Sequence, residues 1–439
     1  MEAVEKKDVQ PEGYRVTDAG VIPSDWRCLR IEQICNLING RGFKPHEWGL
    51  DGLPIIRIQN LNGSQDFNFF DGAYDKKLEI EEGQLLFAWS GSRGTSFGPH
   101  IWHGQKALLN YHTWKVVKTD DSVDSQYFYF ALKALTKVIE ESAHGASALV
   151  HTQMGEMKKF VVPVPPTLKE QTAIANALSD VDALIRELDK LIVKKQAIKT
   201  ATMQQLLTGK KRLPEFAKNE DGTPKGYKKT ELGEIPNDWK VQPIRQLLLD
   251  VPRYGINAPA VPLTNGLPVY IRITDISESG YFSPVEKVGV KSQFSHMYEL
   301  TDGDIVLART GASVGKSYLY NPDDGSLVFA GFLIKVSPNT TVLNPKYLRQ
   351  YLNTEQYWNW VKVNSMRSGQ PGINGNEYGS LPIPLPSLTE QTAIASILSD
   401  MDEELQALEK RLKKTHQIKQ GMMQELLTGK TRLLKPESK

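Results

Sequence analysis

The sequence predicts an α+β protein in which two globular domains, related by a pseudo-twofold axis, are separated by two long antiparallel helices that form a coiled-coil spacer. Three observations predict this architecture: the chain repeats itself once, each repeat contains short β-type runs, and each repeat ends in a long heptad pattern. The chain has 439 residues, which is enough for two to four domains with cores of their own.

Two motifs occur twice in nearly the same form. The motif Ile-Pro-x-Asp-Trp ends at Trp26 and again at Trp239, 213 residues apart, and the motif Leu-x-Glu-Gln-Thr-Ala-Ile-Ala has its glutamine at Gln171 and Gln391, 220 residues apart. A solenoid unit repeats roughly every 20–50 residues, far less than either spacing. We therefore interpret the chain as one duplicated unit, which implies a pseudo-twofold object.

The first part of each repeat, roughly residues 23–166 and 236–386, predicts a mixed α+β domain. Short β-type runs such as residues 53–58 and 304–308 are separated by Gly, Pro, Asn and Asp, and helical patterns such as residues 125–142 lie between them. These globular parts match each other much less than the helical parts do. The pattern is typical of a protein with two different binding domains on a common frame.

The second part of each repeat predicts one helix of about 40 residues, or roughly 60 Å. Capping-box patterns start the two helices at Thr167 to Glu170 and Ser387 to Glu390, and Gly209 and Gly429 stand where each would end. Apolar residues recur in alternating steps of four and three, which is the seam of a coiled coil. The predicted helix-pairing residues are Ile174, Leu178, Val181, Ile185, Leu188, Ile192, Ile394, Leu398, Met401, Leu405, Leu408 and Leu412.

Polar residues interrupt this seam in its C-terminal half, at Lys195, Lys199, Thr202, Thr415 and Lys419. Polar seam positions weaken a coiled coil but can set its register. Alternatively, the lysine stems pack along the seam and their ammonium groups reach solvent.

The predicted boundaries are residues 1–166 for the N-terminal domain, 167–212 for the first spacer helix, 213–386 for the C-terminal domain, 387–430 for the second spacer helix and 431–439 for a tail.

Composition indicates a soluble, cytoplasmic protein. Two cysteines are too few for a disulfide framework, no apolar run reaches the roughly 18 residues that span a bilayer, and the charged N-terminus is not a secretory signal. The net charge of +2 does not by itself indicate nucleic-acid binding. A basic stretch over residues 184–230 is either a solvated helix face or a surface that follows phosphates.

Taken together, these motifs carry a family resemblance that covers essentially the whole chain. The chain resembles the specificity subunit of a type I restriction–modification enzyme in its Ile-Pro-x-Asp-Trp motifs, its proline-rich Leu-x-Glu-Gln helix starts and its Leu-Leu-Thr-Gly-Lys helix ends. The segments 309–316 and 368–374 fit the same pattern. Their counterparts in the first repeat, residues 89–96 and 144–147, depart from it.

The resemblance implies two target-recognition domains, each of which reads one half of a bipartite, gapped and asymmetric double-stranded DNA target. It also implies that the paired helices dock two methyltransferase subunits, which methylate adenine N6 with S-adenosylmethionine, and that restriction subunits with translocase and nuclease activity join through them. The chain itself is expected to be a non-catalytic subunit without a cofactor.

No catalytic or metal site is predicted from the residues. Residues 311–317 resemble a phosphate-binding loop but place three residues between the glycines where four are needed. A metal site could be suggested for three histidines, His100, His103 and His112, but the sequence offers no cysteine or acidic ligand to complete it. Two alternatives stay open: a protein-assembly scaffold without sequence-specific DNA binding, and a nucleotide hydrolase that uses residues 311–317.

DNA specificity requires side chains that match base edges, such as Arg or Lys for guanine and Asn or Gln for adenine. Loops with glycines, which let the backbone approach phosphates, are the expected places for them. Candidates in the first domain are Arg41, Lys44, Arg57, Asn60, Ser90, Ser92, Arg93, Thr95 and His144. Candidates in the second domain are Arg253, Tyr254, Asn257, Arg272, Thr274, Arg309, Thr310, Ser313, Lys316, Arg367 and Gln370.

Overall fold

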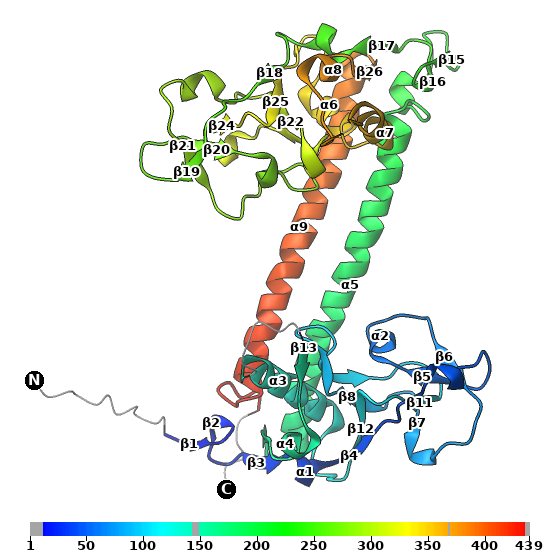
Figure 1. Ribbon diagram of the computed structural model, residues 1–439, viewed down its shortest axis with the longest axis vertical. Helices are drawn as coiled ribbons and strands as arrows, with labels where there is room; N and C mark the ends of the chain where they lie inside the picture. Colours follow the sequence, from blue (N-terminus) through cyan, green and yellow to red (C-terminus); the bar gives the residue numbers. More distant parts are fainter. Residues whose placement is uncertain (1–11, 143–148, 368, 435–439) are drawn as a thin grey trace, which may run out of the picture. The chain divides into compact units, whose positions relative to one another are not determined.

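The structure is a computed structural model, and it describes residues 12–142, 149–367 and 369–434. The chain forms two compact units. Unit 1 combines the residues up to Asp189 with those from Arg411 onward, and unit 2 is Lys190–Lys410. The two long helices, α5 (Leu168–Leu206) and α9 (Leu388–Leu426), each contribute one part to each unit (Figure 1).

Among its described residues, unit 1 has two four-stranded sheets, with strand orders β10-β8-β12-β4 and β6-β5-β11-β7, and three short two-stranded pairings. Its strands are β1 (Tyr14–Thr17), β2 (Gly20–Pro23), β3 (Arg27–Arg30), β4 (Cys35–Asn39), β5 (Leu53–Ile56), β6 (Asn68–Phe70), β7 (Glu79–Ile80), β8 (Leu85–Ala88), β9 (Ser90–Ser92), β10 (Gly98–Ile101), β11 (Ala107–Leu109), β12 (Thr113–Lys118), β13 (Leu149–His151) and β14 (Val161–Val164). Its other α-helices are α1 (Ile31–Ile34), α2 (Ile58–Leu61), α3 (Ser125–Ser142) and α4 (Met154–Met157).

Unit 2 repeats this frame, with sheets ordered β18-β25-β22-β23 and β19-β21-β20-β24. Its strands are β15 (Tyr227–Thr230), β16 (Gly233–Pro236), β17 (Lys240–Pro243), β18 (Arg253–Tyr254), β19 (Ala260–Pro262), β20 (Val269–Ile271), β21 (Val288–Val290), β22 (Ile305–Ala308), β23 (Ser317–Leu319), β24 (Leu327–Phe329), β25 (Leu333–Val336) and β26 (Pro382–Leu385). Its other α-helices are α6 (Pro345–Tyr351), α7 (Glu355–Asn364) and α8 (Gly375–Gly379).

The predicted mixed α+β class is confirmed, and the two units share the pairing pattern of their first four-stranded sheet. The pairings of β8 with β10 and β12 in unit 1 match those of β22 with β23 and β25 in unit 2. The second sheet of each unit also contains one parallel pair, β5 with β11 and β20 with β24. Among the described residues, no helix is both long and apolar enough to cross a membrane.

The two long helices run antiparallel where they meet in each unit, as the sequence predicts. In unit 1 the start of α5 shares a core with the end of α9, because Ile174 and Leu178 pack in one cluster with Leu426. In unit 2 the roles are exchanged, and Ile394 and Leu398 of α9 share a core with Leu206 of α5. All twelve predicted helix-pairing residues are buried or half-buried.

The lysines in the seam form ion pairs between the helices. Lys199 Nζ lies 2.5 Å from Asp402 Oδ1 in unit 2, and Lys419 forms the same kind of pair with Asp182 in unit 1. The two ion pairs are equivalent in the duplicated sequence. Lys419 lies 220 positions after Lys199, and Asp402 lies 220 positions after Asp182. Lys195 adds a pair with Glu404 at 2.7 Å. A partly buried pair is satisfied in one register only, which supports the register-setting interpretation of these lysines.

An arginine beyond each helix end binds the start of the other helix. In unit 2, Arg212 Nε and Nη2 donate to the carboxylate of Glu390 at 2.9 and 2.5 Å, and Nη1 donates to Asp238 at 2.9 Å. In unit 1, Arg432 makes the same bidentate contact with Glu170 at 2.8 and 2.7 Å. It also pairs with Asp25 at 2.8 Å. We call these two groups the arginine clamps.

The clamps change the interpretation of the predicted capping boxes. Their first half is present, because Thr167 and Ser387 accept hydrogen bonds from the backbone N–H groups of Glu170 and Glu390 at 3.2 and 3.3 Å. The glutamate carboxylates, however, bind the clamp arginines instead of returning to the cap residues. A bidentate, charge-assisted contact is stronger than a bond to one neutral amide.

Gln171 and Gln391 directly follow the two clamped glutamates, and each connects its helix start to a loop of the globular part and to the proline-rich segment before the helix. Gln171 is fully buried; its amide donates to the carbonyls of Ser122 and Pro165, both at 3.0 Å, and its oxygen accepts from Asp124 N at 2.7 Å. Gln391 makes the equivalent three bonds in unit 2. A buried amide with its partners present holds the helix start in a fixed place against the globular part.

The glycines at the helix ends are required by both backbone and packing. Gly209 and Gly429 have φ angles of 71° and 70°, in the left-handed region that favours glycine. A Cβ at Gly429 would lie 2.5 Å from Pro23 Cγ, and one at Gly209 would lie 2.3 Å from Pro236 Cδ. The repeated Ile-Pro and Thr-Gly motifs therefore contact each other directly.

We expect Arg432→Ala to lower the free energy of unfolding of the chain by about 3 kcal/mol, because it leaves the buried Glu170 carboxylate without its cation. Urea denaturation followed by circular dichroism measures the change. Lys430→Ala, which removes an exposed charge two residues away, is the matched control and should cost less than about 0.5 kcal/mol. Equal effects of the two substitutions would show that the unit 1 clamp does not stabilise the chain.

Candidate nucleic-acid interface

Three segments of unit 2 meet at one end of its β18-β25-β22-β23 sheet, and they bring several sequence-predicted residues together. The guanidinium of Arg309, just after β22, lies over the ring of Tyr254 at 5.1 Å from its centroid, and its Nε donates to Gly331 O at 3.1 Å. Tyr254 in turn accepts a hydrogen bond from Gly375 N at 3.0 Å. Thr310 forms a β-bridge with Gly372, so Gln370 and its loop adjoin the same place.

The loop over residues 309–316 is held from beneath by two buried tyrosines. Tyr357 donates to Gly315 O and Tyr378 donates to Ala308 O, both at 2.7 Å. Burial raises the pKa of both phenols, so they stay neutral donors. Each hydroxyl fixes a carbonyl at one end of the loop, and the loop is therefore presented in a defined conformation.

Most cations among the unit 2 candidates are paired with an acidic residue. Arg272 makes a bidentate contact with Asp275 at 2.9 and 2.8 Å, which raises its pKa through the hydrogen bond. Arg253 pairs with Asp250, and Arg367 lies 2.5 Å from Glu377. Among the described residues, no carboxylate lies within ion-pair distance of Arg309. Its charge is therefore the most available for a phosphate or a guanine edge.

Lys316, the other predicted cation of the 309–316 segment, is engaged within the protein. Its ammonium lies 2.6 Å from Glu278, and its side chain is only 17% exposed. Arg309 and Lys316 are close in sequence, yet their side chains turn to different partners. The remaining candidates of unit 2 lie at the surface or half-buried: Asn257, Thr274 and Gln370 are exposed, and Thr310 and Ser313 are half-buried.

Unit 1 places a tryptophan where unit 2 has Arg309. The backbone N–H of Trp89 donates to His112 O at 3.1 Å, as that of Arg309 donates to Phe332 O at 3.0 Å. The side chains also make equivalent bonds, because Trp89 Nε1 donates to Tyr111 O at 2.9 Å. Indole and guanidinium thus occupy the same position on the same frame.

Trp89 belongs to an aromatic cluster that the sequence analysis missed. Its ring lies 5.2 Å from that of His112 and 6.1 Å from that of Trp114, and the ring of Tyr111 lies 3.7 Å from that of His112. Tyr111 is 47% exposed, and burial lowers the pKa of His112, which favours its neutral form. The alignment of residues 89–96 with 309–316 places Trp89 opposite Arg309, but Trp89 was not among the predicted site residues.

The other unit 1 candidates lie in two further places. Arg41 pairs with Glu47 and lies over the rings of Phe43 and Phe70 at 4.7 and 4.9 Å. Arg57 lies over the ring of Trp48 at 5.2 Å. In unit 1 these two candidate cations are thus associated with aromatic rings.

Asn60 is buried and engaged inside the protein. It accepts from Arg57 N at 3.0 Å and donates to the carbonyls of Ser64 and Asp66 at 3.1 and 2.9 Å, so in this conformation it supports its loop. The surface candidates are Lys44, Ser92, Arg93 and Thr95, and Ser90 is half-buried. The remaining candidate, His144, lies outside the described residues.

His100 and residues 311–313 belong to the two alternative sites that the sequence suggests. His100 Nε2 lies 3.0 Å from Ser96 O, and burial lowers the pKa of the ring. Within the described ranges, no group of three His, Cys, Asp or Glu residues is placed to hold a metal ion. Gly311–Ser313 forms a 3₁₀ turn.

The chain is similar to known proteins over most of its length. The family model described as the type I restriction modification DNA specificity domain matches residues 23–199 and 263–420. The chain is 26% identical over 429 residues to the MjaVIII specificity subunit of Methanocaldococcus jannaschii, with 94% of each chain covered. It is 23% identical over 409 residues to the EcoBI specificity subunit of Escherichia coli, with 89% of this chain and 82% of that relative covered.

A solved structure shares the fold. The S subunit of a type I restriction–modification system from M. genitalium superposes with a TM-score of 0.58 at 16% identity, over 92% of this chain and 96% of that one.

We expect Arg309→Ala to weaken binding to a DNA sequence selected from a random pool by about 10- to 100-fold, because a well-formed arginine contact to a guanine is worth about 1–3 kcal/mol. The preference for guanine at one position should be lost. Fluorescence anisotropy at fixed salt measures the affinity. Lys316→Ala is the control and should have a smaller effect, since Glu278 already neutralises that charge. If both substitutions leave the affinity unchanged, this surface does not contact DNA.

Proposed function

We propose, since this chain belongs to the family of type I restriction–modification DNA specificity proteins, that its two globular parts read two different halves of a bipartite, gapped and asymmetric DNA target. Membership of the family makes the chain a DNA-recognising specificity subunit. The observation that carries the proposal is the equivalence of Trp89 and Arg309. One frame occurs twice, and the residue directly after the β8 or β22 strand differs in chemistry.

The different chemistry of the two positions supports an asymmetric target. An arginine matches the N7 and O6 acceptors of guanine in the major groove, whereas an aromatic side chain offers an apolar surface to a thymine methyl group or a sugar. The other cations around each position would contact phosphates, which orient the protein without specifying bases. We therefore assign residues 1–166 and 213–386 to the two target-recognition domains, and 167–212 and 387–430 to spacer helices before the tail at 431–439.

The duplicated helices support the binding of two identical partners. The ion pairs of Lys199 with Asp402 and of Lys419 with Asp182 recur at equivalent positions, so each unit offers the same helical arrangement. Two adenine-N6 methyltransferase subunits would dock there and supply both S-adenosylmethionine and catalysis. Restriction subunits would join through them. The chain itself would contribute recognition and assembly, with no reaction of its own.

A protein-assembly scaffold is the alternative, and salt dependence separates the two functions. The affinity of a DNA-binding subunit falls as salt rises, because each phosphate contact releases counterions. A scaffold has no such DNA affinity to lose.

We expect co-expression of this chain with its cognate methyltransferase subunits to methylate adenines in a single gapped, asymmetric motif. Long-read sequencing of the host genome detects the modified bases. Exchange of residues 239–386 for those of a relative should change one half of the motif and leave the other half intact. Exchange of residues 27–163 is the reciprocal control and should change the other half. A genome without a modified motif, or a motif that neither exchange alters, would contradict the proposed function.

A further inference from the structure

Phe332 is an exposed aromatic residue, and the strand register of unit 2 places its side chain next to that of Arg309. It lies in the turn between β24 and β25 and is 55% exposed. Arg309 directly follows β22, whose last residue, Ala308, lies opposite Leu333 of β25. The backbone N–H of Arg309 donates to Phe332 O at 3.0 Å, so the register continues by one more residue. Side chains directly opposite each other in an antiparallel pair lie on the same face, with their Cβ atoms about 4.5–5.5 Å apart.

The equivalent pair of unit 1 shows this side-chain contact directly. Ala88, the last residue of β8, lies opposite Thr113 of β12. The next pair is Trp89 with His112, and their rings lie 5.2 Å apart. The duplicated frame thus places two neighbouring side chains at this end of each sheet. They are an indole and an imidazole in unit 1, and a guanidinium and a phenyl ring in unit 2.

The guanidinium of Arg309 is held in place while its two terminal nitrogens stay available. It lies over the ring of Tyr254 at 5.1 Å from the centroid, and its Nε donates to Gly331 O at 3.1 Å. Among the described residues, neither Nη group has a hydrogen-bond acceptor. Two such donors match the O6 and N7 acceptors of guanine. A side chain beside them lies close to the next base pair, because base pairs are stacked about 3.4 Å apart along the duplex.

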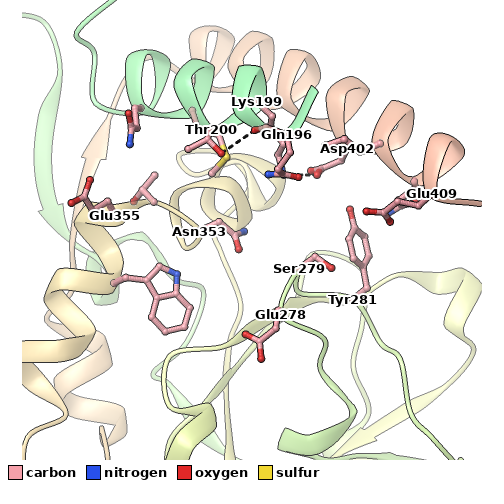
Figure 2. Close-up of a pocket in the computed structure, with 16 residues that line it drawn as sticks. Gln196, Lys199, Thr200, Glu278, Ser279, Tyr281, Asn353, Glu355, Asp402 and Glu409 are labelled. Atoms are coloured by element: carbon pink, nitrogen blue, oxygen red, sulfur yellow. Dashed lines mark hydrogen bonds and ion pairs between the residues drawn. The ribbon is translucent and has the colours of Figure 1, made fainter. Parts of the chain in front are cut away.

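The second cation of the 309–316 segment, Lys316, belongs to a different part of unit 2. Its ammonium pairs with Glu278 at 2.6 Å. Glu278 lines a pocket of about 460 Å³ together with Asp402 of α9 (Figure 2). The lining of this pocket includes neither Arg309 nor Phe332. The Arg309–Phe332 pair therefore forms a surface of its own, in which one side chain is cationic and the other apolar.

We propose that Phe332 is a specificity-determining residue, whose ring contacts the 5-methyl group of a thymine one base pair from the guanine that Arg309 binds. The inference rests on the proposed function, which makes this end of unit 2 a DNA-reading surface. Thymine is the base that presents a methyl group in the major groove, and phenylalanine is one of the side chains that contact it there. Uracil has the same hydrogen-bonding groups and lacks only this methyl, so exchange of thymine for uracil isolates the contact.

Exchange of thymine for uracil in a selected DNA target tests the proposal. The full chain selects a target from a random pool, and each thymine of that target is then replaced in turn by uracil. Fluorescence anisotropy at fixed salt should show roughly threefold to fivefold weaker binding for one of these probes, the factor expected for the burial of one methyl group. That thymine should adjoin the guanine whose preference Arg309→Ala removes. Phe332→Ala should bind the unmodified target more weakly by at least the same factor, and the uracil exchange should then have no further effect.

Two further variants separate the apolar contact from a general effect of the substitution. Phe332→Leu keeps an apolar side chain and should retain part of the response to uracil. Phe294→Ala removes a ring that is 54% exposed before the 3₁₀ turn Ser295–Tyr298, and it should leave both the affinity and the uracil response as in the unaltered chain. A target in which no thymine beside that guanine responds to uracil, or a response that persists in Phe332→Ala, would overturn the inference. Failure of the chain to select any DNA sequence contradicts the proposed function itself.

Discussion

The interaction on which the rest of the structure depends is the contact between the end of one long helix and the start of the other. Glu390 and Glu170 are 1% and 3% exposed, and a carboxylate buried to this degree needs a cation beside it. Arg212 and Arg432 can supply that cation only if each helix ends where the other begins. The clamps and the nearby glycine–proline contacts therefore require the antiparallel arrangement. They also attach the helix ends to the β1–β2 hairpin in unit 1 and to the β15–β16 hairpin in unit 2.

The clamps and the glycine–proline contacts are the same in both units, but the surfaces of the two units differ. The sheets, the buried glutamines and the seam ion pairs occur twice, whereas the position after the β8 or β22 strand holds an indole in one unit and a guanidinium in the other. A duplicated frame fixes where a side chain is presented, and its chemistry is then free to change without affecting the core.

The sequence predicted the features that local pattern determines. The heptad steps, the cap residues and the glycine ends predicted the two helices, because each signal lies within a few residues of the element it controls. Their antiparallel direction followed from the duplication, which implies a twofold relation between the repeats. The partners of Glu170 and Glu390 could not be found in this way, since the clamp arginines lie 262 and 178 residues away. Lys316 and Trp89 show the same limit: a loop pattern does not reveal which acidic residue pairs with a lysine or which aromatic rings cluster around a tryptophan.

Zero-length carbodiimide cross-linking of the purified chain, followed by mass spectrometry, tests the antiparallel contact most directly. The reagent joins a lysine amine to a carboxylate only when the two already touch. The account predicts that Lys199 couples to Asp402, Lys195 to Glu404 and Lys419 to Asp182, alongside the control pair of Lys106 and Glu79 at 2.8 Å within one globular part. Coupling of Lys199 to Glu425 in place of Asp402, with the control pair formed, would contradict it.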